Sequence, residues 1–307
     1  MLGRIASFVL AFAVTATSAT SSTAQEREFL GFGWLLTNDL IGDGKDRWRT
    51  GSIATSRVWG RGWNGALPEN FGDIIEFRFG GEIIAPRKLN DSGPGDRPYA
   101  GAMSWGLHTH VQRGATSIST GADLVAIGPM TGLDDFQSWL HDLVGIPGPS
   151  ASVRAAQIAN QWLPRAVIEI GRDIDLGPGS RLRPFVEGRA GDETLLRAGF
   201  DFTFGGFGSG DLLVRDWVTG QRYRAVGTRQ PGLSFMAGAD VAKVFDSVYL
   251  PSSRGFQTTD MRSRVRAGLH WQGEKSSMFY GLTWLGEEFA GQSEGQLVGA
   301  VTLSLRF

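Results

Sequence analysis

Residues 296–307 alternate between apolar side chains and small or polar ones. Leu303 and Leu305 fall on one face of this segment, whereas Thr302 and Ser304 fall on the opposite face. Alternation with a period of two is typical of a β-strand that has one apolar face. This segment is therefore predicted to form a strand with apolar surroundings on one side and polar surroundings on the other.

Segments with the same alternation recur, and turn-like pieces such as 176–180 and 272–276 separate them. They are residues 74–80, 99–107, 116–125, 166–171, 182–190, 196–204, 233–241, 262–271 and 277–285. Roughly a dozen strands of about ten residues predict an all-β fold, a transmembrane antiparallel β-barrel of about 12 strands. Closure suits a bilayer because hydrocarbon offers no partner for the hydrogen bonds of an open sheet edge. A soluble β-sandwich alternates in the same way, so the periodicity alone leaves that alternative open.

The N-terminal segment favours the membrane barrel. Arg4, an apolar run over residues 5–14 and small residues after it have the order of a secretory signal peptide. We therefore predict a signal peptide at residues 1–24 and one outer-membrane β-barrel domain at residues 25–307. Phe307, which closes the last alternating segment, resembles the terminal signal of outer-membrane barrels. The predicted location is the bacterial outer membrane.

Composition excludes several other classes of protein. The chain contains no cysteine, so disulfide bonds cannot stabilise it. Its net charge is −1, from 30 basic and 31 acidic residues, and it lacks the basic surface that nucleic acid requires. After residue 24, no apolar run approaches the length of a transmembrane helix.

One segment departs from the β pattern. Residues 133–145 have apolar side chains at helical spacing, Asp134 in the first turn and Gly145 at the far end, which together predict a short helix. Gln137 and His141 are four residues apart and project from the same side of it. A helix inside a barrel sequence belongs in an extracellular loop, and loops on a rigid scaffold often carry function.

Histidine is the first candidate for chemistry at this loop. His141 lies on the predicted helix, whereas His108, His110 and His270 lie in predicted strands, where lining the lumen explains them. Because histidine titrates near neutral pH, it suits a general base. A structural role for a single histidine remains the alternative.

Oxygen-rich side chains gather near the ends of predicted strands. They are Asn38 and Asp39, then Asp46, Arg47 and Thr50, and then Asp91, Asp96 and Arg97. A hard cation such as calcium prefers ligands of this kind. Ordinary turns also concentrate Asn and Asp, so turn chemistry remains the alternative. The chain contains no G-x-S-x-G, H-E-x-x-H or P-loop motif.

Six short motifs follow one another along the chain. They are Asn38-Asp39, Asp46-Arg47-x-x-Thr50-Gly51, Asp96-Arg97-Pro98-Tyr99-Ala100-Gly101, Ile127-Gly128-Pro129 followed by Gln137 and His141, Gln157-Ile158-Ala159-Asn160, and Glu288-Phe289-Ala290-Gly291-Gln292. In their order and spacing, these motifs resemble the lipid A 3'-O-deacylase family of outer-membrane enzymes, from Asn38 to Phe307. The resemblance implies that the stretch Asp96–Gly101 helps to build a site. An ordinary turn would not need so specific a sequence.

The resemblance implies a twelve-stranded barrel whose active site lies between the barrel wall and an extracellular-loop helix. The implied activity is calcium-dependent hydrolysis of the ester that holds the 3'-linked acyloxyacyl chain of lipid A. Lipid A or lipopolysaccharide would be the substrate, Ca²⁺ the cofactor and outer-membrane lipids the surroundings. We expect a monomer that binds no nucleic acid.

The resemblance also assigns roles to residues. His141 matches the general base that activates water, and Asn38, Asp39 and Thr50 match polar residues of the site. Asn38 and Asp39 are the implied calcium ligands, and Lys88 stands for a functional lysine of the family. The supporting residues are Asp46, Arg47, Asp96, Arg97, Gln137 and Gln157.

Three departures from the family pattern keep other functions open. Lys88 lies three residues from the expected position of the lysine, and a family glutamate would fall near Pro147, where the sequence has no acid. Arg49 replaces the tyrosine that the family tends to have before the threonine. The alternatives are therefore a non-catalytic or porin-like outer-membrane barrel on the same scaffold and a phospholipase with a serine nucleophile, for which no serine has a supporting context.

Overall fold

The computed structural model describes residues 26–91, 93 and 95–305. The predicted signal peptide at residues 1–24 and the terminal Phe307 lie outside the described residues. Among the helices of the described ranges, none is both long and apolar enough to cross a membrane.

The main sheet is a closed antiparallel barrel, so the predicted fold is confirmed. Of the thirteen strands in the sheet, the short β7 (Ile174–Gly177) pairs with β8 alone, which leaves twelve strands in the wall. Pairing of β1 with β15 and of β6 with β8 completes the ring. The wall strands are β1 (Glu28–Asn38), β2 (Trp48–Gly60), β3 (Ile75–Ala85), β4 (Ala100–Arg113), β5 (Thr116–Ile127), β6 (Gln161–Gly171), β8 (Ser180–Ala190), β9 (Glu193–Phe204), β12 (Gly232–Ser247), β13 (Arg262–Gln272), β14 (Ser276–Leu285) and β15 (Gln296–Leu305).

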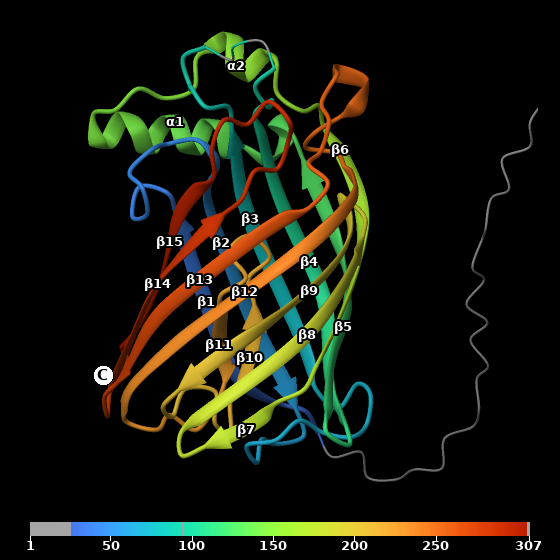
Figure 1. The fold of residues 1–307 in the computed structure, drawn as a ribbon, viewed down its shortest axis with the longest axis vertical. Coiled ribbons are helices and arrows are strands. Elements are labelled where there is room, and N and C mark those ends of the chain that lie inside the picture. The colour runs from blue at the N-terminus through green and yellow to red at the C-terminus, as the bar shows by residue number, and fades with distance from the viewer. Residues whose placement is uncertain (1–25, 92, 94, 306–307) are drawn as a thin grey trace, which may run out of the picture.

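The helices lie together at one end of the barrel (Figure 1). The connection from β5 to β6 contains the 3-10 turn η1 (Pro129–Thr131), α1 (Leu133–Val144) and α2 (Ala151–Ala155). A second 3-10 turn, η2 (Ser252–Arg254), lies in the connection from β12 to β13. Outer-membrane barrels have their longer loops on the extracellular side, so we call this end the extracellular end.

The wall is apolar outside and charged inside. In β13, Val265 and Leu269 are exposed on the outer face, whereas Arg264 and Arg266 are buried on the inner face. Both arginines bind the buried Asp240, at 2.9 and 2.5 Å. Losing this carboxylate would leave buried arginines uncompensated, which costs about 3–5 kcal/mol. Such alternation places lipid outside the wall and a polar lumen within it.

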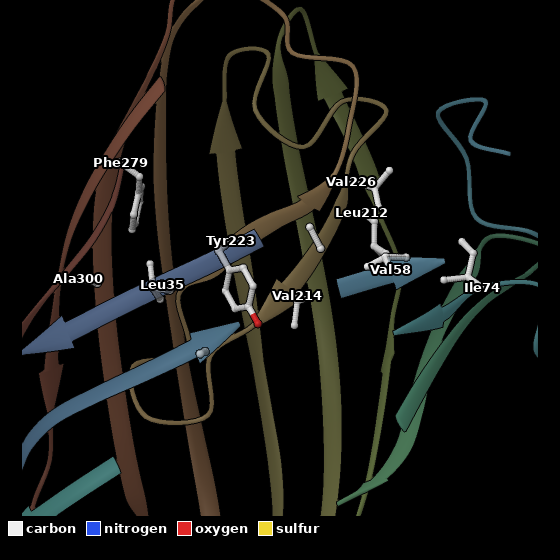
Figure 2. Close-up of a cluster of buried hydrophobic side chains, with 11 residues drawn as sticks. Leu35, Val58, Ile74, Leu212, Val214, Tyr223, Val226, Phe279 and Ala300 are labelled. Atoms are coloured by element: carbon white, nitrogen blue, oxygen red, sulfur yellow. The ribbon is translucent and has the colours of Figure 1, made fainter. Parts of the chain in front are cut away.

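A hairpin that the sequence did not reveal occupies the lumen. It consists of β10 (Leu212–Arg215) and β11 (Arg222–Val226) in the connection from β9 to β12. Its apolar residues pack against Leu35 and Val58 of the wall (Figure 2). A Cβ added to Gly33 of β1 would lie 2.2 Å from the carbonyl oxygen of Arg224, so only glycine allows the hairpin to approach β1.

The hairpin contacts the wall on several sides. The hydroxyl of Tyr223 lies 2.8 Å from Ser56 Oγ on β2. Arg215 binds Glu169 of β6 and Asp201 of β9, at 2.6 and 2.7 Å. On a further side, Gln221 Nε2 donates to the carbonyl oxygen of Ala267 on β13 at 3.2 Å. The hairpin therefore bridges the lumen from wall to wall.

Candidate active site

Helix α1 rests on the outer face of the barrel wall. It begins beside Gly101 on β4, where an added Cβ would lie 2.6 Å from Thr131 Oγ1 and 2.9 Å from Leu133 Cβ. Gly101 lies an even number of positions from Leu107 and therefore on the same face of the strand, the lipid-facing side on which Leu107 is exposed. The missing side chain at Gly101 therefore lets the helix start directly against the wall.

The face of α1 that points at the protein is polar. Its buried residues are Asp134, Gln137 and His141, at helical spacing. Gly132 precedes the helix and Gly145 follows it, both with a left-handed backbone conformation. The glycine at the C-terminal end is predicted from the sequence. The predicted helix at 133–145 thus matches α1 to within one residue, and Gln137 and His141 share its buried face.

A β-bulge aims Thr50 at this face. The pairing of β2 with β3 shifts between Arg49 and Gly51, so Thr50 has no Cα partner on β3. Such bulges redirect a side chain at the rim of a barrel. The Thr50 hydroxyl lies 3.1 Å from Asp39 Oδ1 and also donates to Asp46 Oδ1. Two carboxylates therefore converge on one threonine.

His141 completes the group. Its Nε2 lies 2.8 Å from Asp46 Oδ2, and its Nδ1 lies 2.9 Å from the carbonyl oxygen of Pro147. Since a carbonyl only accepts, Nδ1 carries a proton. A 2.8 Å contact between Nε2 and a carboxylate oxygen needs a proton between the two atoms, so this geometry is that of an imidazolium paired with Asp46. Nε2 can accept a proton only after that proton has left and the Asp46 carboxylate has turned away. The Pro147 carbonyl thus orients the histidine at the position where a family glutamate was expected.

Tyr99, in the stretch Asp96–Gly101, is hydrogen-bonded to α1. Tyr99 OH donates to Gln137 Oε1 at 2.9 Å, and Gln137 Nε2 donates to Asp46 Oδ1 at 3.1 Å. Tyr99 is fully buried, and burial raises the pKa of its hydroxyl, so it remains a hydrogen-bond donor. This chain of contacts links the stretch to the carboxylate that pairs with His141.

Asp39 is buried close to two other carboxylates, which disfavours its negative charge. Its Oδ2 accepts from the backbone N–H of Arg47 at 2.8 Å and from Gln296 Nε2 at 3.2 Å. Burial raises the pKa of Asp39 to about 8, and the nearby charges of Asp46 and Asp43 add to this rise against the hydrogen bonds that lower it. A bound cation would relieve this charge repulsion.

The other predicted residues divide into neighbours of the site and turn residues. Arg47 binds Glu294 and Asp43, at 2.5 and 2.9 Å, and so fixes the loop between β1 and β2. Gln157 Nε2 donates to Asp134 Oδ2 at 3.0 Å, which ties the segment after α2 to α1.

Asn38 and Lys88 do not join the carboxylates. Asn38 Oδ1 accepts from the backbone N–H of Leu40 at 2.7 Å, as in an ordinary turn. Lys88 is exposed, and it makes no ion pair with residues 26–91, 93 or 95–305. Asp96 accepts from the backbone N–H of Arg87 at 2.6 Å, a turn contact, and Arg97 is fully buried and pairs with Glu288.

Sequence reasoning missed two groups that hold the site. Gln296 donates to Asp39 and, at 2.6 Å, to the carbonyl oxygen of Arg47. Gln296 is a large amide at the end of the last strand that lies at the rim, and this position could have indicated a role in the site. The Pro147 carbonyl has no side-chain signature at all.

The oxygen atoms of this site have the chemistry that a hard cation prefers. Asp39 and Asp46 supply carboxylates and Thr50 a hydroxyl, and calcium commonly completes its coordination with backbone carbonyls and water. In the described ranges, no three His, Cys, Asp or Glu side chains gather as a metal site by themselves. The fit therefore rests on the two carboxylates, the hydroxyl and the repulsion at Asp39.

The close approach at Gly101 leads to a first prediction. Gly101→Ala should displace the start of α1 and lower any activity at His141 by about tenfold, because small misplacements of reacting groups are costly. Gly81→Ala on the outer face of β3 is the matched control, since its Cβ would meet Ile53 at an ordinary 3.5 Å. Turnover and heat-dependent electrophoretic mobility of both variants test this; equal turnover would contradict it.

Comparison with known proteins adds a family and a fold. The family model described as Outer membrane protein LpxR matches residues 6–307. The structure of LpxR from Salmonella typhimurium is 17% identical, with a TM-score of 0.73, over 90% of this chain and 100% of that one. At this identity, the likeness to the Salmonella protein shows the fold. None of the curated protein sequences matches this chain significantly.

More distant barrels also resemble the chain. The β-domain of the Bordetella autotransporter BrkA is 11% identical with a TM-score of 0.48, and covers 91% of this chain and 99% of that one. The translocator domain of the autotransporter NalP from Neisseria meningitidis is 12% identical with a TM-score of 0.34, covering 92% and 88%. Neither likeness carries an argument about function.

Proposed function

The chain belongs to the LpxR family of outer membrane proteins, and we propose that it is a lipid A 3'-O-deacylase. The observation that carries the proposal is the contact of His141 Nε2 with Asp46 at 2.8 Å, between a loop helix and the outer wall. A lipid-linked ester can reach this place from the membrane without entering the barrel. The proposed substrate is lipid A or lipopolysaccharide in the outer leaflet.

In the proposed reaction, His141 acts as the general base. The Asp46 carboxylate first turns away from Nε2, and a water molecule takes its place. The neutral Nε2 then takes a proton from this water, whose oxygen attacks the carbonyl carbon of the 3'-linked ester. Asp46 stabilises the imidazolium that forms, and the Pro147 carbonyl keeps the ring oriented. The bond to the sugar oxygen then breaks, and the same proton returns to that oxygen. The products are a sugar hydroxyl and an acyloxyacyl acid.

The proposal includes calcium at the carboxylates. Asp39, Asp46 and Thr50 would hold it, and Asn38 would contribute from the adjoining turn if its side chain left Leu40. When bound, calcium supplies Lewis-acid stabilisation of the oxyanion. Gln137 keeps Asp46 in place through its 3.1 Å hydrogen bond. All of these groups come from one chain, so the proposal needs no oligomer.

Removing one carboxylate should weaken the response to calcium. Asp39→Asn is expected to raise the calcium concentration for half-maximal activity by roughly tenfold or more, because the number of charged ligands tunes calcium affinity. Added calcium should then restore part of the lost activity. Titrating activity with calcium after chelation, for both proteins, is the measurement. Unchanged activity of the unmodified protein after chelation would refute the calcium proposal.

The lumenal hairpin speaks against the porin-like alternative. Its side chains bridge β2, β6, β9 and β13, so solutes would have to pass a packed obstacle. Planar-bilayer conductance and lipid A deacylation measured on one preparation would separate the two functions. Steady conductance of porin size without a change in lipid A would favour the alternative.

A further inference from the structure

The surface of α1 that faces away from the wall is apolar and uncovered. Phe136, Trp139 and Leu143 are 49%, 58% and 69% exposed, respectively. These residues lie opposite the buried Asp134, Gln137 and His141 at about 100° per residue. A loop helix in water would be expected to turn polar side chains outward. The polarity of α1 is therefore the reverse of that of a water-exposed helix.

The two flanks of the helix also differ. Leu140 and Val144 are exposed on one flank, whereas Asp135 and Asp142 are exposed on the other. The apolar surface thus covers the back and one flank, and the acidic residues mark a separate polar flank. A helix with one apolar and one charged side is typical of an element that lies at a membrane surface.

The height of α1 on the barrel places this surface beside lipid. The helix contacts the wall at Gly101 of β4 and the loop between β1 and β2 at Asp46. On the two strands that this loop joins, Leu36 and Ile53 are exposed on the outer face. Ile53 is two residues from Gly51, next to the bulge at Thr50, which is about 7 Å along a strand. The apolar outer surface of the wall therefore reaches almost to the site.

The loop after β1 joins the two apolar surfaces. A Cβ added to Gly299 of β15 would lie 2.3 Å from the carbonyl oxygen of Ile41, so the loop lies directly on the wall. The same carbonyl accepts from the hydroxyl of Tyr280, which is exposed on the outer face of β14, at 2.9 Å. Leu40 in this loop is 65% exposed. Figure 1 shows α1 at the extracellular end of the barrel, above this loop and projecting beyond the side of the barrel.

We propose that α1 is a membrane-interfacial helix whose apolar face, formed by Phe136, Trp139, Leu140, Leu143 and Val144, docks onto the acyl chains of the outer leaflet. The occupant follows from continuity with the lipid-facing wall, through Leu40 and Ile41. This placement rests on the outer-membrane barrel. Its consequence, that His141 is held at the boundary of head groups and acyl chains, rests on the proposed function.

The absence of cysteine allows a clean test. Leu143→Cys and Asp142→Cys place one thiol each on adjacent exposed residues of α1, the first on the apolar face and the second on the acidic flank. Each full-length variant is labelled with an environment-sensitive fluorophore and reconstituted in phosphatidylcholine vesicles. Some vesicles contain lipid with a nitroxide near the ester end of the acyl chain. Heat-dependent electrophoretic mobility confirms that both barrels are folded.

The label at position 143 should emit at shorter wavelength and be quenched several-fold more strongly by the nitroxide lipid than the label at position 142. Equal, weak quenching at both positions would overturn the proposal. A blue shift at position 143 without nitroxide quenching, together with crosslinked dimers, would show that a second copy covers the face and would also overturn it. Neither label requires lipid A hydrolysis, so failure of the proposed function would leave this readout unchanged.

Discussion

His141→Ala is expected to lower the rate of lipid A deacylation by about a thousandfold, because a positioned general base contributes roughly 10²–10⁴ to a rate. In the structure, His141 Nε2 faces Asp46 at 2.8 Å, and the Pro147 carbonyl fixes the ring from its other nitrogen. Alanine cannot take a proton from water, and the remaining site would rely on electrostatic stabilisation alone. Initial rates with purified, reconstituted protein and lipid A measure the loss.

The matched control for this variant is the next residue on the helix. Asp142 is exposed and lies on the acidic flank, so Asp142→Ala should keep nearly full activity. Heat-dependent electrophoretic mobility should be the same for both variants, because neither side chain packs into the barrel wall. A His141→Ala protein that remains active would refute the assignment of the base.

Asp46→Asn should lower the rate by about a hundredfold, which is typical for loss of one preorganised electrostatic group. The amide keeps the shape of the side chain but cannot stabilise an imidazolium at His141. Its hydrogen bonds to Thr50 and Gln137 would also need rearrangement, because both now donate to Asp46 Oδ1. Rates should fall at saturating lipid A, which distinguishes a loss of catalysis from weaker substrate binding.

Asp43→Asn offers the control for Asp46→Asn. Asp43 belongs to the same loop but pairs with Arg47 at 2.9 Å, away from His141. Its replacement should change the rate by less than a few fold. If the two amide variants lose activity equally, the negative charge of the loop as a whole is responsible and the specific role of Asp46 is wrong.

The strands could be predicted from sequence because a membrane barrel enforces alternation locally. Residues 262–271 were predicted as a strand, and β13 spans Arg262–Gln272. The prediction over residues 74–80 fell short of β3, which continues to Ala85 through Gly80 and Gly81. The alternating pattern ends at these glycines, but a Cβ at Gly80 would lie 2.1 Å from Trp217 of the lumenal connection. That reason for glycine is invisible to a local pattern.

The lumenal hairpin shows the same limit. Each of its strands has at most five residues, too few to give a clear period. Contacts with distant wall strands hold it, such as that between Trp217 Nε1 and Glu82 at 3.1 Å. Such long-range partners cannot be derived from one sequence.

The site divides in a similar way. Sequence singled out His141, Asp39 and Thr50 by residue type and by motif resemblance. Sequence reasoning did not predict the contact of His141 with Asp46, 95 positions away. This contact depends on where α1 lies relative to the loop between β1 and β2. Sequence reasoning also treated the position near Pro147 as a missing acid, whereas a backbone carbonyl now contacts the histidine there at 2.9 Å. A contact made by a backbone carbonyl cannot be predicted from the types of side chain in the sequence.

Mass spectrometry of lipid A from cells that produce this chain tests the central claim most directly. Cells producing His141→Ala at the same level of folded barrel provide the comparison. We predict loss of one 3'-linked acyloxyacyl group from lipid A with the unmodified protein and intact lipid A with the variant. Intact lipid A in both, with calcium present and the barrel inserted, would contradict the proposed function and leave a non-catalytic barrel.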